Sequence, residues 1–109
     1  MNLKALSYKL RQDTVDLIRA GKAGHIGGDM SVMEILTELY FDQMNISPEN
    51  MDSPDRDYFV MSKGHSVEAY YSVLAEKGFF QKEELHKTFS KFGSRFIGHP
   101  NNTPPGIEM

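Results

Sequence analysis

Three of the chain's four histidines directly follow a glycine, and these pairs are the residues best suited to chemistry. They are Gly24-His25, Gly64-His65 and Gly98-His99. An imidazole exchanges a proton near neutral pH, and a glycine lets a ligand approach the backbone closely. The three pairs are therefore candidates for proton transfer or for anion binding.

The pair Gly64-His65 lies in MSKGHS, where a short apolar run ends and a helical pattern begins. The first backbone N–H groups of a helix are unpaired and carry the positive end of its dipole, so anions bind there. His65 could add a side-chain donor to a phosphate oxygen. The alternative is that Gly64 is only a turn residue and His65 a hydrogen-bonding group at the helix start.

The other two pairs leave the same choice open. Gly27 and Gly28 follow His25 and could expose backbone to a ligand, or they could form a flexible corner between two helices. His99 precedes Pro100 on a constrained loop that could aim its ring, although an isolated loop histidine is often only solvated. His86 lies in a charged helical stretch, and we assign it no role.

A metal site is not predicted. The histidines are too far apart in sequence for a short-range ligand motif, and no acidic residue recurs beside each one. The carboxylates of Asp55-Arg56-Asp57 could support acid–base work, but before a strand we interpret them as a turn with an Arg–carboxylate hydrogen bond.

Composition narrows the class of protein. With 109 residues, 39% hydrophobic and 25% charged, the chain is expected to be soluble and to form at most one domain. A net charge of −3 with scattered basic residues gives no reason to expect nucleic acid. The absence of cysteine excludes disulfides and Cys-type zinc sites. The charged N-terminus lacks the apolar core of a signal peptide or a membrane span, so we expect a cytoplasmic protein.

Apolar residues recurring every three to four positions predict four helices. They cover about residues 3–20, 31–40, 65–77 and 83–92. We expect Ser31 and Glu34 to form a capping box at the start of the second helix, and Gly78 to end the third. The expected apolar face of the second helix consists of Val32, Ile35, Leu36, Leu39 and Tyr40.

A single strand is expected among these helices. Residues 45–57 have turn chemistry, the tail from Gly98 is loop-like, and the run Tyr58-Phe59-Val60-Met61 predicts a buried strand. A lone strand needs neighbours for its backbone groups. Either the domain is mostly helical, or these residues are the front of a larger sheet whose other strands are absent from the 109 residues.

Four blocks in order, GHIGGDMSVMEILTELYF, PDRDYFVMSKGHSVEAYYSVLAEKGFF, GSRFIGHP and PPGIEM, resemble the transketolase family from about Ile18 to the last residue. The two glycines after His25 are similar to the N-terminal subunit of the split bacterial type. The resemblance implies an α/β thiamine-diphosphate-binding fold with helices around a parallel sheet, most of which is missing. Residues 1–109 would then be the incomplete N-terminal portion of the diphosphate-binding domain.

The resemblance also implies an activity. Transketolases transfer a two-carbon ketol unit from a ketose phosphate to an aldose phosphate with thiamine diphosphate and Mg²⁺, as in the pentose phosphate pathway. By similarity, His25 and His99 are catalytic: His25 lines the substrate channel and moves protons, and His99 hydrogen-bonds the ketose. Gly64 and His65 would bind the cofactor. The three imidazoles are expected to meet in one pocket.

Two departures and the chain's length qualify these expectations. Asp29 stands where a serine is common, and Asn101 where an acidic residue often follows His-Pro. Family members carry their metal ligands downstream, so none is expected here, and the 109 residues alone should be inactive. The expected partner is a C-terminal subunit with the pyrimidine-binding domain, in a dimer or heterotetramer. Alternatives are a related ketol transferase for another sugar phosphate, or a non-catalytic partner-binding module.

Overall fold

The described part of the chain folds into α-helices joined by irregular segments. The structure is a computed structural model, and it describes residues 2–21, 26–61, 66–90, 94, 96, 106 and 107. Within these ranges the helices are α1 (Leu3–Gly21), α2 (Ile26–Glu38), α3 (Val67–Lys77) and α4 (Lys82–Thr88). A π-helical turn, Leu39–Gln43, extends α2, and a 3₁₀ turn covers Pro48–Asn50.

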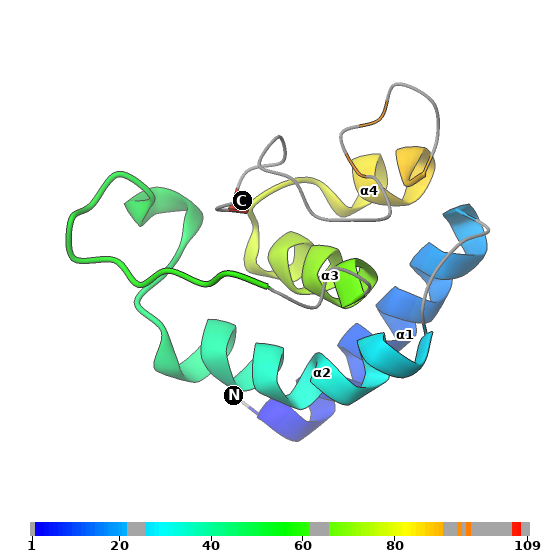
Figure 1. The fold of residues 1–109 in the computed structure, drawn as a ribbon, viewed down its shortest axis with the longest axis horizontal. Helices are drawn as coiled ribbons and strands as arrows, with labels where there is room; N and C mark the ends of the chain where they lie inside the picture. Colours follow the sequence, from blue (N-terminus) through cyan, green and yellow to red (C-terminus); the bar gives the residue numbers. More distant parts are fainter. Residues whose placement is uncertain are drawn as a thin grey trace.

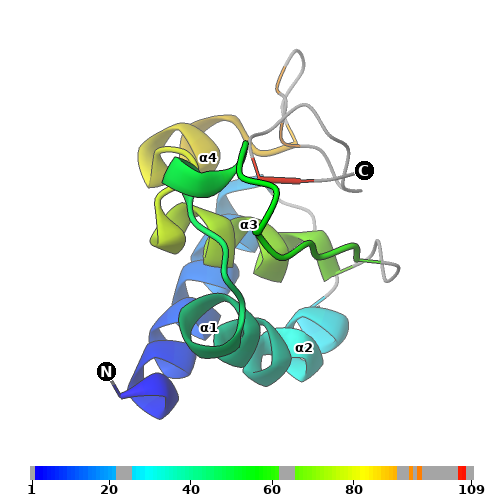
Figure 2. The same cartoon turned by 90° about the vertical axis from the view of Figure 1, so that its left-hand side faces the viewer.

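Helix α3 is the centre of the fold. In Figures 1 and 2 it lies between the pair formed by α1 and α2 and the shorter α4. Every residue from Val67 to Ala75 is buried, so α3 is covered on all sides. A helix buried on all sides must present apolar or internally paired groups in every direction. The other helices therefore have to meet the particular side chains of α3.

Two adjacent tyrosines of α3 anchor separate aromatic clusters. Tyr70 packs against Tyr40 and Phe59, with ring centroids 6.2 and 5.3 Å away. Tyr71 packs edge-on against rings from the segments before and after α4, namely Phe80, Phe89 and Phe96 at 6.5, 6.0 and 5.3 Å. Each such pair contributes about 0.5–1.5 kcal/mol beyond area burial. The Tyr70 cluster joins α3 to the π-helical turn after α2, and the Tyr71 cluster joins α3 to the segments that follow it.

Three of the helix predictions are confirmed in type and approximate position. α1 buries Leu10 and Leu17 on the predicted face. α3 ends where predicted, because Gly78 adopts φ 102° and donates its N–H to the carbonyls of Leu74 and Ala75. α4 ends at Thr88, short of the predicted end, where the chain turns at Ser90 with φ 61°.

The predicted start of the second helix is wrong. α2 begins at Ile26 and includes both glycines, so Ser31 lies inside the helix and donates its hydroxyl to the carbonyl of Gly28. Glu34 forms an ion pair with Arg11 of α1 instead of a capping box. The buried face is also rotated from the predicted one: Ile35 is 57% exposed, whereas Met33 is fully buried. Packing against two neighbouring helices sets this face.

The predicted buried strand is also wrong for the described residues. Residues 58–61 are extended but pair with no strand, and Tyr58 and Val60 are 64% and 55% exposed. Phe59 and Met61 turn toward the core and are partly buried. The described part of the chain contains no β-ladder, so the parallel sheet of the expected fold class is not seen there. A strand needs a partner for its backbone groups, and none of the described segments supplies one.

The loop prediction for residues 45–57 is confirmed. Asn45 and Asp57 close this loop: the N–H of Asp57 donates to the carbonyl of Asn45 at 2.8 Å, and the N–H of Asn45 donates to Oδ2 of Asp57 at 2.7 Å. Arg56 donates to the carbonyls of Met51 and Asp57 and lies over the Tyr58 ring. These contacts fit a structural turn.

None of the described helices has the length and hydrophobicity required to span a membrane.

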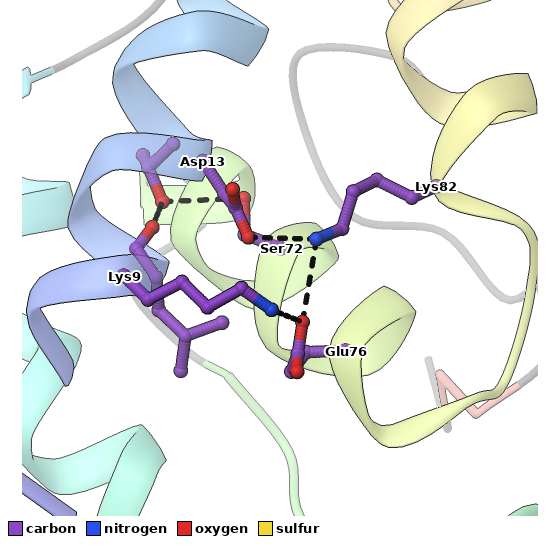
Figure 3. A network of polar contacts seen from close by, with 7 residues as sticks. Lys9, Asp13, Ser72, Glu76 and Lys82 are labelled. Atoms are coloured by element: carbon purple, nitrogen blue, oxygen red, sulfur yellow. Dashed lines mark hydrogen bonds and ion pairs between the residues drawn. The ribbon is translucent and has the colours of Figure 1, made fainter. Parts of the chain in front are cut away.

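A polar network holds α3 between α1 and α4, as Figure 3 shows. Nζ of Lys82 on α4 lies 3.0 Å from Asp13 of α1 and 3.3 Å from Glu76 of α3, and Lys9 of α1 lies 2.7 Å from the same Glu76 oxygen. Nearby, the buried Thr14 hydroxyl donates to Ser72 at 3.2 Å. The network thus links three helices at one point.

The charges of this network stabilise one another. Burial alone would raise the pKa of Glu76, but hydrogen bonds and positive charge from Lys82 and Lys9 hold it below its ordinary value of 4.5. Burial would lower the pKa of Lys82, but Asp13 and Glu76 together raise it above 10.5. Both groups stay charged at neutral pH, which favours a structural role over acid–base catalysis.

The network predicts a pH-dependent loss of stability in Lys82→Met. The free energy of unfolding of the variant at pH 7 should be lower than that of the wild type by about 0.5–1 kcal/mol. The effect is small because the ion pairs of Lys82 are partly exposed. The lowered pKa of Glu76 stabilises the fold above pH 4.5, and this contribution disappears as the pH falls through the folded-state pKa. Urea unfolding at pH 7 and at successively lower pH values should show the gap between variant and wild type narrowing in acid.

Lys87→Met on the same helix is the matched control, because Lys87 is exposed and makes no ion pair within the described ranges. A Lys82→Met effect equal to that of Lys87→Met, or one that does not change with pH, would show that the network contributes nothing.

Two glycines give opposite predictions for substitution by alanine. Gly106 has φ 92°, and a Cβ there would lie 2.8 Å from the Phe79 ring, so Gly106→Ala should lower the unfolding free energy by about 1–3 kcal/mol. Gly27 is the second residue of α2, and no atom of the described residues lies within 4 Å of an added Cβ, so Gly27→Ala should raise it by up to about 1 kcal/mol. Thermal unfolding of the two variants side by side measures both, and shifts of the same sign would refute the packing assigned to Gly106.

Candidate functional site

The predicted site residues His25, Gly64, His65 and His99 lie outside the described residues. The structure does describe residues next to each of them. Ile26, directly after His25, begins α2. Ser66, directly after His65, is the N-cap of α3. Two Gly-His segments therefore directly precede, in sequence, the N-termini of two helices that pack against each other, α2 and α3.

A buried carboxylate fastens these two helix starts to each other. Asp29, in the first turn of α2, is 0% exposed, and its Oδ1 accepts a hydrogen bond from the backbone N–H of Ala69 at 2.8 Å. Ala69 is the third residue of α3, so its N–H is one of the donors that an isolated helix leaves unpaired. A negative acceptor at that end is also favoured by the helix dipole.

The start of α3 is polar as well as buried. Ser66 is fully buried and Glu68 is 1% exposed. The Ser66 hydroxyl makes no hydrogen bond in the described part of the structure. Buried polar groups usually find partners, so this end of α3 differs from its aromatic middle. The amide of Ala69 is already occupied by Asp29, which leaves fewer α3 donors for an external anion than the sequence predicted.

Described residues on both sides of His99 pack against α3 as well. Before it, the Phe96 ring lies 5.3 Å from Tyr71 and 4.8 Å from Phe80. After it, the carbonyl of Gly106 accepts a hydrogen bond from the Tyr70 hydroxyl at 3.5 Å. The structure thus brings residues flanking all three Gly-His pairs to one helix. The shared pocket for the three imidazoles stays a prediction.

The role of Asp29 at α3 was missed by sequence reasoning. It was noted only as a departure from a common serine. One sequence feature points to Asp29: an acidic residue is favoured in the first turn of a helix. This feature applies only if α2 begins at Ile26, whereas the sequence predicts a start at Ser31.

Two other features do not add to the site. Among the described residues, no group of three or more His, Asp or Glu side chains could hold a metal ion. A groove of about 350 Å³ lies between α1 and α2, and none of its lining residues belongs to the start of α2 or α3. It is lined by Leu3, Lys4, Ser7, Tyr8, Arg11, Glu34, Thr37 and Glu38.

Comparison with known proteins identifies the family. The model for the transketolase thiamine diphosphate binding domain matches residues 3–109. One subunit of the apulose-4-phosphate transketolase from Phocaeicola vulgatus is 48% identical over 107 residues, which are 98% of this chain and 38% of that protein. The 6-deoxy-6-sulfo-D-fructose transketolase subunit SqwG from a Clostridium species is 41% identical over 110 residues, covering 100% of this chain and 40% of that protein.

Solved structures agree with these relatives. Transketolase from Leishmania mexicana superposes with a TM-score of 0.87 at 30% identity, over 100% of this chain and 16% of that one. A transketolase variant from Pichia stipitis gives 0.84 at 35% identity, over 98% and 16%. The chain spans about two fifths of the length of the curated relatives named above. With a family model that matches nearly every residue and a fold shared with these enzymes, the chain belongs to the transketolase family.

Proposed function

We propose that this chain is part of the N-terminal subunit of a two-subunit transketolase. The protein transfers a two-carbon ketol unit from a ketose phosphate to an aldose phosphate in the cytoplasm. The observation that carries this proposal is the 48% identity, over 98% of the chain, to a protein that is named as one subunit of a transketolase. The proposed partner is the subunit with the pyrimidine-binding domain, in a dimer or heterotetramer.

Thiamine diphosphate with Mg²⁺ is the proposed cofactor, and when bound it supplies the site that stabilises a carbanion. The family match supports thiamine diphosphate. No described residue is proposed as a metal ligand, because these residues contain no suitable cluster of donors. The buried polar start of α3, with Ser66 and Glu68, suits a segment that faces a polar ligand.

We propose distinct roles for the Gly-His pairs. Gly64 gives access to the backbone beside the cofactor, and His65 donates a hydrogen bond on the diphosphate side. His25 moves protons at the substrate hydroxyls, and His99 hydrogen-bonds the ketose. Imidazoles, which exchange protons near neutral pH, suit a reaction that forms and consumes alkoxides. The packing of all three flanking regions against α3 supports a common site for these groups.

The exposed side chains within residues 58–61 support the proposal that further parts of the complete protein pack against this segment. Tyr58 and Val60 are large apolar side chains, and their exposure in an extended segment is typical of a surface that another part of the protein covers. We propose that these residues form a strand of a parallel sheet in the complete protein, together with further residues of the thiamine-diphosphate-binding fold.

A second candidate function differs in substrate. The two relatives with 48% and 41% identity are named for apulose 4-phosphate and 6-deoxy-6-sulfo-D-fructose. This observation favours a ketol transferase for an uncommon sugar over an enzyme of the pentose phosphate pathway. The third possibility, a non-catalytic module that binds a partner protein, predicts no turnover with any sugar.

The deciding experiment uses the complete gene product mixed with its partner subunit. Ketol transfer is assayed with apulose 4-phosphate, 6-deoxy-6-sulfo-D-fructose and a common ketose phosphate, each with and without thiamine diphosphate and Mg²⁺. We expect turnover with at least one donor, only when cofactor and both proteins are present. No turnover with any donor, although the two proteins associate, would favour the partner-binding module.

Histidine substitutions in that assembled enzyme separate the proposed roles. His65→Ala should weaken thiamine diphosphate binding, and His99→Ala should lower kcat/KM for the ketose by about 10²-fold with little change in cofactor affinity, since it removes a substrate donor. Calorimetry measures the first effect and initial rates the second. His86→Ala on α4 is the control and should stay within about twofold of wild type. Wild-type values for His65→Ala and His99→Ala would remove both residues from the site.

A further inference from the structure

Asp29 is a buried carboxyl group with a defined partner. Its side chain is 0% exposed, and removing a carboxylate from water costs several kcal/mol unless hydrogen bonds compensate. The 2.8 Å bond from Ala69 N–H to Oδ1 is one such compensation, and it joins residues that are 40 positions apart. A carboxylate in this position therefore has a strong preference for one arrangement of the two helices.

This bond adds to the packing that holds α2 against α3. The buried side chains of packed helices interdigitate and already favour certain arrangements of the two helices. A hydrogen bond from one backbone N–H to one carboxylate oxygen is directional and fails when the partners move by about 1 Å. Asp29 thus adds a directional contact between the first turn of α2 and the first turn of α3.

The two residues of this bond lie close in sequence to two of the three Gly-His pairs, Gly24-His25 and Gly64-His65. Asp29 follows His25 by four residues, and Ala69 follows His65 by four residues. A glycine precedes each histidine, and glycine loses more conformational freedom on ordering than any other residue. The described elements that directly follow these segments in sequence are two helix starts. Those elements are the first turns of α2 and α3, which Asp29 joins.

We propose that Asp29 is a positioning residue: it fixes the first turn of α2 against the first turn of α3, the elements that directly follow two of the Gly-His pairs in sequence, and so helps to prepare the site for the cofactor and the sugar. The inference rests on the proposed function. Asp29 itself touches no reacting atom in this proposal. It acts through the backbone of Ala69, and a neutral oxygen at the same place should retain part of its effect.

The test compares three variants of the complete protein assembled with its partner. Asp29→Ala removes the acceptor, and Asp29→Asn keeps an oxygen acceptor without the charge. Thr14→Val is the matched control, because it removes another fully buried hydrogen bond to α3, from Thr14 to Ser72, away from the Gly-His segments. Hydrogen exchange is followed in residues 22–25 and 62–65, and thiamine diphosphate affinity is measured by calorimetry.

We expect Asp29→Ala to raise exchange in both segments together and to raise the Kd for thiamine diphosphate, each by about tenfold, with Asp29→Asn between it and wild type. Thr14→Val should lower Tm without changing either quantity. If Asp29→Ala does not fold, Asp29→Asn decides, with an expected rise of about twofold to threefold in both measurements.

Three results would overturn the inference. Exchange that rises in only one segment, or a cofactor Kd that changes no more than in Thr14→Val, would leave Asp29 with a purely structural role while the proposed function stands. A wild-type assembly that binds no thiamine diphosphate would refute the proposed function itself, and the positioning role with it.

Discussion

Complete burial of α3 is the constraint on which the rest of this structure depends. Every residue from Val67 to Ala75 is buried, so each direction around the helix needs a suitable neighbour. Aromatic rings meet Tyr70 and Tyr71, the Thr14 hydroxyl meets Ser72, and the Asp29 carboxylate meets the amide of Ala69. These contacts come from every part of the described chain, which explains why segments distant in sequence gather at one helix.

The elements that sequence could predict are those set by local signals. The periodicity of α1 and the glycine after α3 act within a few residues, and both predictions are confirmed. The start of α2, the exposure of Ile35 and the state of residues 58–61 were predicted wrongly. Each depends on partners that are distant in sequence. Glu34 forms an ion pair with Arg11 instead of a capping box, and contacts with neighbouring helices determine which face of α2 is buried. An extended segment forms a ladder only when another strand is present.

The protein family could be predicted from the sequence, but the hydrogen bonds and ion pairs between distant residues near the site could not. The Gly-His blocks and their order carried the resemblance that the comparisons confirm. Nothing local indicates that Asp29 accepts a hydrogen bond from a residue 40 positions away. Likewise, Asp13 and Lys82 look like ordinary surface charges until the fold brings them to 3.0 Å. Motifs report which chemistry is present, whereas the relative placement of its parts is a tertiary property.

The unpaired extended segment also affects how the protein can be handled. Residues 58–61 combine aromatic and β-branched side chains with a backbone that belongs to no ladder in the described structure. Such a segment is a template for intermolecular strand addition, the first step toward cross-β aggregates. Production of these 109 residues on their own is therefore expected to favour inclusion bodies, since Tyr58 and Val60 are exposed.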